Sequence, residues 1–298
     1  MESIFVGSVG NRQAEDRPSI LGSYHAFMAE LFCSYLDESE DTTAGVYAVG
    51  GFIGKAAVWD ILEPEWLKSL PQQITAFHAT DCFTGNKEFK SMDIPDRVAL
   101  LDKLTDVIVA HEVKLVGYGL DAKTYQAVAS KKKQNAFLGN KYAAPLGGVV
   151  ELACKAMGSV PGPEDIWKVL DDGETWGQSD FVIESNEYSA SAKHTIESMR
   201  QAKALWFRHR IGKDAYGTKN GTTGIPLLQV ADLGAFMAAK YIGKVPDGKI
   251  PWQGYYQKLV DSKRIYGIVH ADEYSVKRLY ETHLETLKEQ AEEQNPSG

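Results

Sequence analysis

The sequence of residues 31–40, LFCSYLDESE, decides the fold because it joins an apolar, β-forming run to two adjacent acids. The side chains that favour a strand with one face in a core are Phe32, Tyr35 and Leu36. We expect a first strand over 28–37, ending at Asp37 and Glu38. Two neighbouring carboxylates at the end of a buried strand lose hydration unless a cation or hydrogen bonds compensate. The stretch predicts either an acidic turn in water or one part of a cation site.

The composition is that of a globular protein. Of 298 residues, 44% are hydrophobic and 24% charged, and we expect a leader without regular structure over 1–27 and one domain over 28–298. No apolar run is long enough to cross a bilayer, so no membrane partner is expected. Three widely spaced cysteines without a CxxC motif predict a reduced, cytoplasmic protein. The net charge of −8 argues against an extended basic surface.

Glycines and periodicity outline the remaining elements. Residues 46–54, VYAVGGFIG, predict a second strand that forms a hairpin with the first. Its Gly50-Gly51 pair lacks the spacing of a phosphate-binding loop, so we expect a bulge or a close backbone approach. A helical insertion over about 55–112 follows, and it contains a short extended segment at 74–81. The other expected elements are strands at 113–120 and 166–170, helices at 142–158 and 226–241, a basic strand at 205–211 and a helical extension over about 250–294.

Aspartates accompany two further apolar elements. The predicted strand at 166–170 is followed directly by Asp171 and Asp172. The predicted helix at 226–241 is apolar or small at most positions, yet it carries Asp232 in its middle and Gln229 three residues earlier. A carboxylate in a buried helix needs a partner, which can be an arginine, an exposed patch or a metal.

The three aspartates are candidates for one site. Ligands collect beyond strand ends in sheets with helices on both faces. Asp37, Asp171 and Asp232 together would form an oxygen-rich cluster of the kind that binds Mg²⁺ or Mn²⁺. Two such ions can activate water and stabilise a leaving oxygen in phosphodiester hydrolysis. An alternative is that these acids are structural, in ion pairs or at the surface.

Five motifs give the sequence a family resemblance. YLDES, YAVGGFIG, FHATD, KVLDD and LLQVADL follow one another within residues 28–245. With them the chain resembles the family catalogued as domain of unknown function 3800, in the RNase H-like superfamily. The resemblance implies an α/β fold with a mixed central sheet flanked by helices. It also implies a divalent-metal site of Asp37, Asp171 or its neighbour Asp172, and Asp232, with a fourth acid at Glu151 or Asp81.

One residue departs from the family pattern, and several others have two interpretations. Glu40 stands where the family more often has glycine after DES. His78 is a candidate for proton transfer in an acidic site or for a local hydrogen bond. The most basic segment either holds a phosphate backbone or protects an edge strand from aggregation. Its residues are Arg208, His209, Arg210, Lys213 and Lys219.

Two functions are consistent with these features. The first is a metal-dependent nuclease or related phosphoryl-transfer hydrolase that acts on nucleic acid, with the aspartates as metal ligands and Glu38, Asp81, Glu151 and His78 as further candidate site residues. The second is a catalytically inactive RNase H-like module that binds a protein or nucleic-acid partner. A homodimer is expected only because two-fold dimers are common.

Overall fold

The computed structural model describes residues 32–129, 141–156, 179–184, 193, 195, 207–212, 218–219, 222–223, 225–244, 253–278 and 281. The elements in chain order are β1 (Phe32–Asp41), β2 (Val46–Lys55), α1 (Ala56–Ser69), α2 (Ala79–Thr84), η1 (Lys87–Phe89), α3 (Ile94–Ala110), β3 (Lys114–Asp121), α4 (Ala122–Ala129), α5 (Ala143–Ala156), β4 (Ser179–Glu184), β5 (Phe207–Gly212), β6 (Thr218–Lys219), β7 (Thr222–Thr223), α8 (Leu227–Lys244), α9 (Gln253–Asp261) and β8 (Ile265–Ala271).

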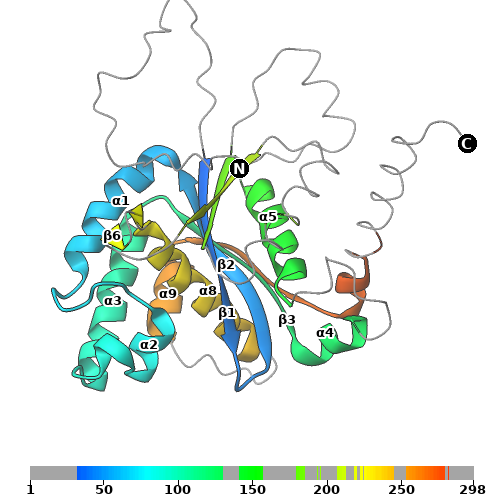
Figure 1. The fold of residues 1–298 in the computed structure, drawn as a ribbon, viewed down its shortest axis with the longest axis horizontal. Coiled ribbons are helices and arrows are strands. Elements are labelled where there is room, and N and C mark those ends of the chain that lie inside the picture. Colours follow the sequence, from blue (N-terminus) through cyan, green and yellow to red (C-terminus); the bar gives the residue numbers. More distant parts are fainter. Residues whose placement is uncertain are drawn as a thin grey trace, which may run out of the picture.

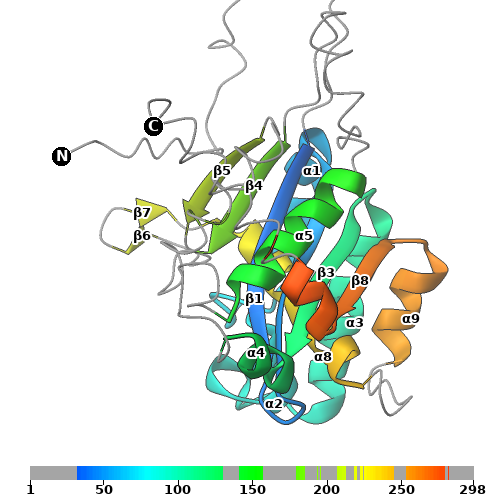
Figure 2. The ribbon, with the colours of Figure 1, turned by 90° about the vertical axis from the view of Figure 1, so that its right-hand side faces the viewer.

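The centre of the fold is a six-stranded mixed sheet in the order β5-β4-β1-β2-β3-β8. β1, β2 and β3 are antiparallel neighbours, whereas β4 is parallel to β1, β5 to β4 and β8 to β3. Helices cover both faces, with α8, α1 and α3 on one side and α5 on the other (Figures 1 and 2). The predicted α/β fold, a mixed sheet flanked by helices, is confirmed.

β1 differs from its prediction because it continues through the acids. It pairs with β2 from Phe32 opposite Lys55 to Asp41 opposite Val46, so Asp37 lies within the strand and not at its end. An acidic run is compatible with a strand here because successive side chains point to opposite faces. Glu40, for example, is exposed and forms an ion pair with Lys141. Residues 28–31 of the predicted strand lie outside the described residues.

The alternation of β1 separates two cores. Odd-numbered side chains such as Tyr35 pack with α8 and the insertion, whereas Leu36 packs with α5 on the opposite face. Burying each large apolar side chain stabilises the fold by about 1.5–3 kcal/mol. The largest fully buried residues of the α8 face include Phe52, Trp66, Phe77 and Phe89. The sheet is therefore fixed between two apolar layers, and the orientation of Asp37 follows from its position in the strand.

Small residues bring α8 close to the sheet. A Cβ on Gly234 would lie 2.8 Å from the Gly51 Cα, and one on Gly50 would lie 3.1 Å from the Ala235 Cα. At Gly51 a side chain is excluded, since its Cβ would meet the Tyr35 carbonyl oxygen at 1.9 Å. The expected close backbone approach at Gly50-Gly51 is confirmed, and the helix that approaches is the one that carries Asp232.

The helical insertion is present between β2 and β3, as predicted. α1 ends at Ser69, and α3 begins after Asp93, whose carboxylate accepts a hydrogen bond of 2.9 Å from the Asp96 N–H. The prediction of an extended segment over 74–81 was wrong at its end, because α2 begins at Ala79. Four apolar residues precede Asp81 in that stretch: Ile74, Ala76, Phe77 and Ala79. A sequence this short does not distinguish a strand from the first turn of a helix.

The C-terminal region contains a strand that the sequence reasoning did not predict. α9 is helical as expected, but β8 joins the sheet beside β3. Later in the predicted helical extension, a helix begins after Asp272, whose carboxylate accepts a 2.8 Å hydrogen bond from the Ser275 N–H. The predicted leader at 1–27 and strand at 166–170 lie outside the described residues. In the part of the chain that the structure describes, no helix has the length and apolar character to span a membrane.

Candidate functional site

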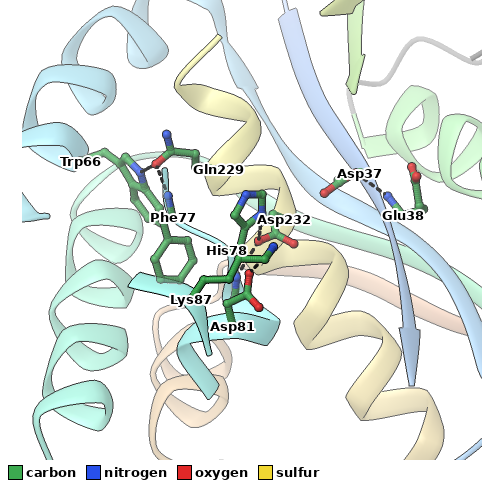
Figure 3. A network of polar contacts seen from close by, with 10 residues as sticks. Asp37, Glu38, Trp66, Phe77, His78, Asp81, Lys87, Gln229 and Asp232 are labelled. Atoms are coloured by element: carbon green, nitrogen blue, oxygen red, sulfur yellow. Dashed lines mark hydrogen bonds and ion pairs between the residues drawn. The ribbon is translucent and has the colours of Figure 1, made fainter. Parts of the chain in front are cut away.

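Asp37 lies in the middle of β1 on the face that packs against α8. Its residue is 7% exposed, and its Oδ1 accepts a hydrogen bond of 2.8 Å from the Glu38 N–H. Strand alternation puts Asp37 and Asp41, four residues apart, on the same face of β1. This is the face of α8, because Asp41 contacts Lys240 of that helix. Figure 3 shows the Asp37 carboxyl group on the α8 side of β1 and the Glu38 side chain on the other side. Of these two predicted acids, only Asp37 is directed toward the α8 layer.

Asp232 lies on α8 with 16% of its side chain exposed. Its Oδ2 accepts a hydrogen bond of 2.6 Å from the Ala79 N–H, the first residue of α2. The His78 Nδ1 is 3.9 Å from the same oxygen (Figure 3). A carboxylate at this point satisfies an N–H that has no partner inside the helix. The FHATD and QVADL motifs, about 150 residues apart in sequence, therefore meet at the Asp232 carboxylate.

The two aspartates belong to the two elements that pack together on this side of the sheet, β1 and α8. Gly51, whose Cα lies against Gly234 of α8, is the cross-strand partner of Leu36. Asp37 directly follows Leu36, and Asp232 lies about half a helical turn before Gly234. Asp37 itself is the cross-strand partner of Gly50, which lies against Ala235 of α8, about one helical turn after Asp232. β1 and α8 thus each carry a mostly buried carboxylate on the same side of the sheet.

Gln229, one helical turn before Asp232 on α8, binds the segment that leads into α2. Its side chain is fully buried, and its Oε1 accepts hydrogen bonds from the Phe77 N–H at 3.1 Å and from the Trp66 Nε1–H at 3.4 Å. Sequence reasoning placed Gln229 on the face of Asp232 but gave it no role. The signal that could have indicated one is a buried amide on an otherwise apolar helix, because such a group needs hydrogen-bond partners.

Asp81 has a cation beside it. The Lys87 Nζ is 2.8 Å from the Asp81 Oδ2, and the two side chains are 70% and 15% exposed. Lys87 has φ = 48°, which is uncommon for a residue other than glycine. In Figure 3 its amino group points toward Asp81, close to the His78 and Asp232 side chains. Asp81 therefore belongs to the same region as Asp232, but one of its oxygens is used in an ion pair.

The other predicted site residues fall in three classes. Glu151 lies on α5, on the opposite face of the sheet, with the Lys155 Nζ at 2.8 Å. Asp171 and Asp172 lie outside the described residues. Of the basic segment, residues 208–210 belong to β5, an edge strand of the described sheet, and Lys219 belongs to β6. Of the two candidates for a fourth acid, Asp81 lies on the α8 side and Glu151 does not.

A second acid of β1 also contacts α8. Asp41 is 2% exposed, and its Oδ2 lies 2.8 Å from the Lys240 Nζ. Its Oδ1 accepts hydrogen bonds from the Thr43 and Ala44 N–H groups at 3.1 and 3.2 Å. Burial acts to raise the pKa of Asp41, but Lys240 and the two N–H groups outweigh it and hold this pKa below its usual range. Asp41 is therefore a charged anchor between the hairpin and the end of α8.

The donors of the described part of the site suit a hard cation in kind. Carboxylate oxygens are the protein ligands that Mg²⁺ and Mn²⁺ prefer, and Asp37 and Asp232 supply them. Within the described ranges, however, no group of three or more histidine, cysteine, aspartate or glutamate side chains is arranged to hold a metal ion. The third predicted ligand, Asp171, lies outside those ranges. Comparisons of this chain with models of protein families, with curated proteins and with solved structures found no match.

Proposed function

We propose that this chain is a divalent-metal-dependent phosphodiester hydrolase that acts on nucleic acid, a nuclease or a related phosphoryl-transfer enzyme. The observation that carries the proposal is that β1 and α8, which pack together, each carry a mostly buried carboxylate on one side of the sheet, Asp37 and Asp232. Carboxylates that share a poorly hydrated region repel one another, and a cation between them relieves the repulsion. The family resemblance of the LDES and QVADL motifs supports the same assignment.

In this proposal Asp37 and Asp232 hold Mg²⁺ or Mn²⁺, with Asp171 as the third ligand. The bound ion would supply a lowered pKa for water and charge stabilisation on the phosphate. The protein fixes its carboxylates beforehand, because each accepts a backbone hydrogen bond, Asp37 from Glu38 and Asp232 from Ala79. Carboxylates oriented in advance do not have to reorganise when the reaction takes place.

The proposed substrate is nucleic acid, because a phosphodiester is the group on which such a carboxylate site acts. Its phosphate backbone would contact the basic segment that includes Arg208, Arg210 and Lys219. β5, which carries the two arginines, is parallel to β4 and separated by it from β1, the strand of Asp37. A nucleic-acid backbone that crosses this edge of the sheet would lie two strands from β1, which carries the proposed metal ligand Asp37.

A second candidate function is a binding module without catalysis. It is favoured by the structural use of the acids near α2, since Asp232 receives the Ala79 N–H and Asp81 pairs with Lys87. In that case the carboxylates stabilise the insertion, and the fold presents a surface to a protein or nucleic-acid partner. The two candidates differ in one measurable property, which is cleavage that depends on the metal and on Asp37.

Cleavage of labelled single-stranded DNA, duplex DNA and RNA tests the proposal with Mg²⁺, with Mn²⁺ and with EDTA. We expect metal-dependent cleavage that falls at least ~100-fold in Asp37→Asn and in Asp232→Asn, which corresponds to ~2.7 kcal/mol of transition-state stabilisation. Asp41→Asn, on the same face of the same strand, is the control and keeps its cleavage. Cleavage that persists in EDTA or in both variants would contradict the enzyme assignment and favour the binding module.

A further inference from the structure

The amide of Gln229 is placed to control the geometry around Asp232. α8 is apolar on most of its surface, and Gln229 is fully buried in it. A buried amide is costly without hydrogen bonds, whereas an apolar side chain of similar size has no such cost. Gln229 uses its carbonyl oxygen to accept from the Phe77 N–H and the Trp66 indole. The first of these bonds attaches the chain before α2 to α8.

Gln229 and Asp232 form a matched pair of acceptors. They are three residues apart on a helix, so they lie on one face about a turn apart. They receive the N–H groups of Phe77 and Ala79, which are two residues apart in the chain. His78 lies between these two donors, and its Nδ1 is 3.9 Å from the Asp232 Oδ2. The two hydrogen bonds together fix both the position and the direction of this segment.

We propose that Gln229 is a positioning residue of the carboxylate site, because it holds segment 77–79 so that the Ala79 N–H and His78 meet Asp232. This inference rests on the proposed function and goes beyond it by assigning a role to a residue that would not touch the metal. With the Gln229 bond absent, the Asp232 carboxylate carries more of the polar attachment of the segment to α8 and follows the movement of its donor. The carboxylate would then no longer be held in one orientation.

The apolar surroundings of Gln229 and Phe77 suit a substitution that removes the hydrogen bonds of Gln229 and keeps an apolar side chain of similar length. Phe77 is fully buried, with its ring 5.6 Å from that of Trp66 and 6.0 Å from that of Phe89, both edge to face. Gln229→Met keeps the length of the side chain and removes both acceptor contacts. Thr105→Val is a matched control, since it removes one buried hydrogen bond, from the Thr105 Oγ1 to the Leu101 carbonyl oxygen at 2.8 Å in α3. Both variants lose buried hydrogen bonding, but only the first affects α8.

The first measurement is amide hydrogen exchange on the full-length chain without metal. We expect Gln229→Met to increase the exchange rates of the Phe77 and Ala79 N–H groups at least tenfold over wild type, and Thr105→Val to leave both unchanged. The second measurement is a calorimetric titration with Mn²⁺ alone. Removal of groups that orient metal ligands commonly weakens metal binding about 10–100-fold, and we expect about tenfold in Gln229→Met and no change in Thr105→Val.

The two measurements separate this inference from the proposed function. An Ala79 N–H that exchanges in Gln229→Met as slowly as in wild type would show that Asp232 holds the segment without help, and would overturn the inference. Unchanged Mn²⁺ affinity in Gln229→Met would overturn it too. A wild type that binds no Mn²⁺ would contradict the proposed function and the metal part of this inference, and the exchange rates would still decide whether Gln229 positions the segment.

Discussion

β1 carries two aspartates on the side of α8, one at its hairpin end and one in its middle, and their surroundings differ. At the hairpin end, the nearly inaccessible Asp41 meets the amino group of Lys240 and two turn N–H groups. In the middle of β1, Asp37 is buried on the same face, and α8 carries a second mostly buried acid, Asp232, about two turns before Lys240. Both acids belong to one strand and point to one face, yet Asp41 forms an ion pair with Lys240 of α8, whereas Asp37 accepts a hydrogen bond from the Glu38 N–H of its own strand.

Asp41 is a structural acid, whereas Asp37 is a candidate metal ligand. An acid that meets a lysine on the facing helix completes an ion pair whose charges balance. In the proposed site, two acids on one side of the sheet add negative charge to a poorly hydrated layer, which is the arrangement that a divalent cation stabilises. We expect substitutions near the two aspartates to differ in kind: those near Asp41 change folding stability, and those near Asp37 change metal binding.

The largest effect on stability is expected from Lys240→Met. It removes the ammonium group, which lies 2.8 Å from the Asp41 carboxylate and 5.7 and 5.8 Å from the ring centroids of Phe83 and Phe236. Removal of one partner of a buried pair leaves an uncompensated charge, which commonly costs about 3–5 kcal/mol. Denaturant unfolding of the wild type and the variant measures this loss.

Asp41→Asn/Lys240→Met sharpens that test, because it removes both charges together. We expect the double variant to be more stable than Lys240→Met alone, since no unpaired carboxylate stays buried. Equal stability of the two variants would show that the Asp41 charge is hydrated, and the contrast between the two aspartates would then lose its basis.

A smaller effect is expected from Cβ groups inserted at two glycines of α8. In Gly234→Ala the new Cβ would lie 2.8 Å from the Gly51 Cα, and in Gly243→Ala it would lie 2.7 Å from the Ala44 Cβ. Overpacking of this kind commonly costs about 1–3 kcal/mol. We expect both variants to lose stability, but only Gly234→Ala to weaken Mn²⁺ binding, because Gly234 lies two residues from Asp232 and packs against Gly51, the cross-strand partner of Leu36. Equal affinities in a Mn²⁺ titration would refute this.

The smallest effect is a dependence of stability on pH. The pKa of Asp41 is lowered in the folded chain, so its charge contributes stability above the pKa of an unfolded aspartate, about 3.9. That contribution is lost as the pH falls through the lower folded pKa. We therefore expect wild type to exceed Asp41→Asn in stability by a constant amount between pH 5 and 7, and the difference to shrink below about pH 4. Thermal unfolding across this range measures it, and a difference that grows in acid would contradict the sign.

Much of the fold could be predicted because the relevant patterns are local. The hairpin around Gly50, the helical insertion and the buried helix at 226–241 follow from alternation, apolar periodicity and turn residues. The end of β1 was predicted too early because acids were taken to end a strand, whereas strand pairing with β2 continues to Asp41. β8 was missed because most of its residues are only partly buried at the edge of the sheet, so its alternation is weak.

The candidate site was less predictable, because its contacts join distant segments. The sequence indicated Asp37, Asp232 and His78 as site residues, and the structure brings His78 to Asp232. It gave no indication that Asp232 caps α2 or that Lys87 pairs with Asp81. Those contacts depend on where the insertion folds back onto α8, which no local pattern specifies. Glu151 was a candidate because it is an acid among apolar neighbours, a pattern that does not tell which face of the sheet its helix covers.

The most direct test of the central claim is a calorimetric titration of the wild type with Mn²⁺, beside Asp37→Asn, Asp232→Asn and Asp41→Asn. The account predicts that the wild type and Asp41→Asn bind the ion and that the other two variants lose most of that binding. This result would place two acids from distant parts of the chain at one metal. Absence of binding in the wild type, or binding indifferent to Asp37 and Asp232, would contradict the account and leave these carboxylates as structural residues of the fold.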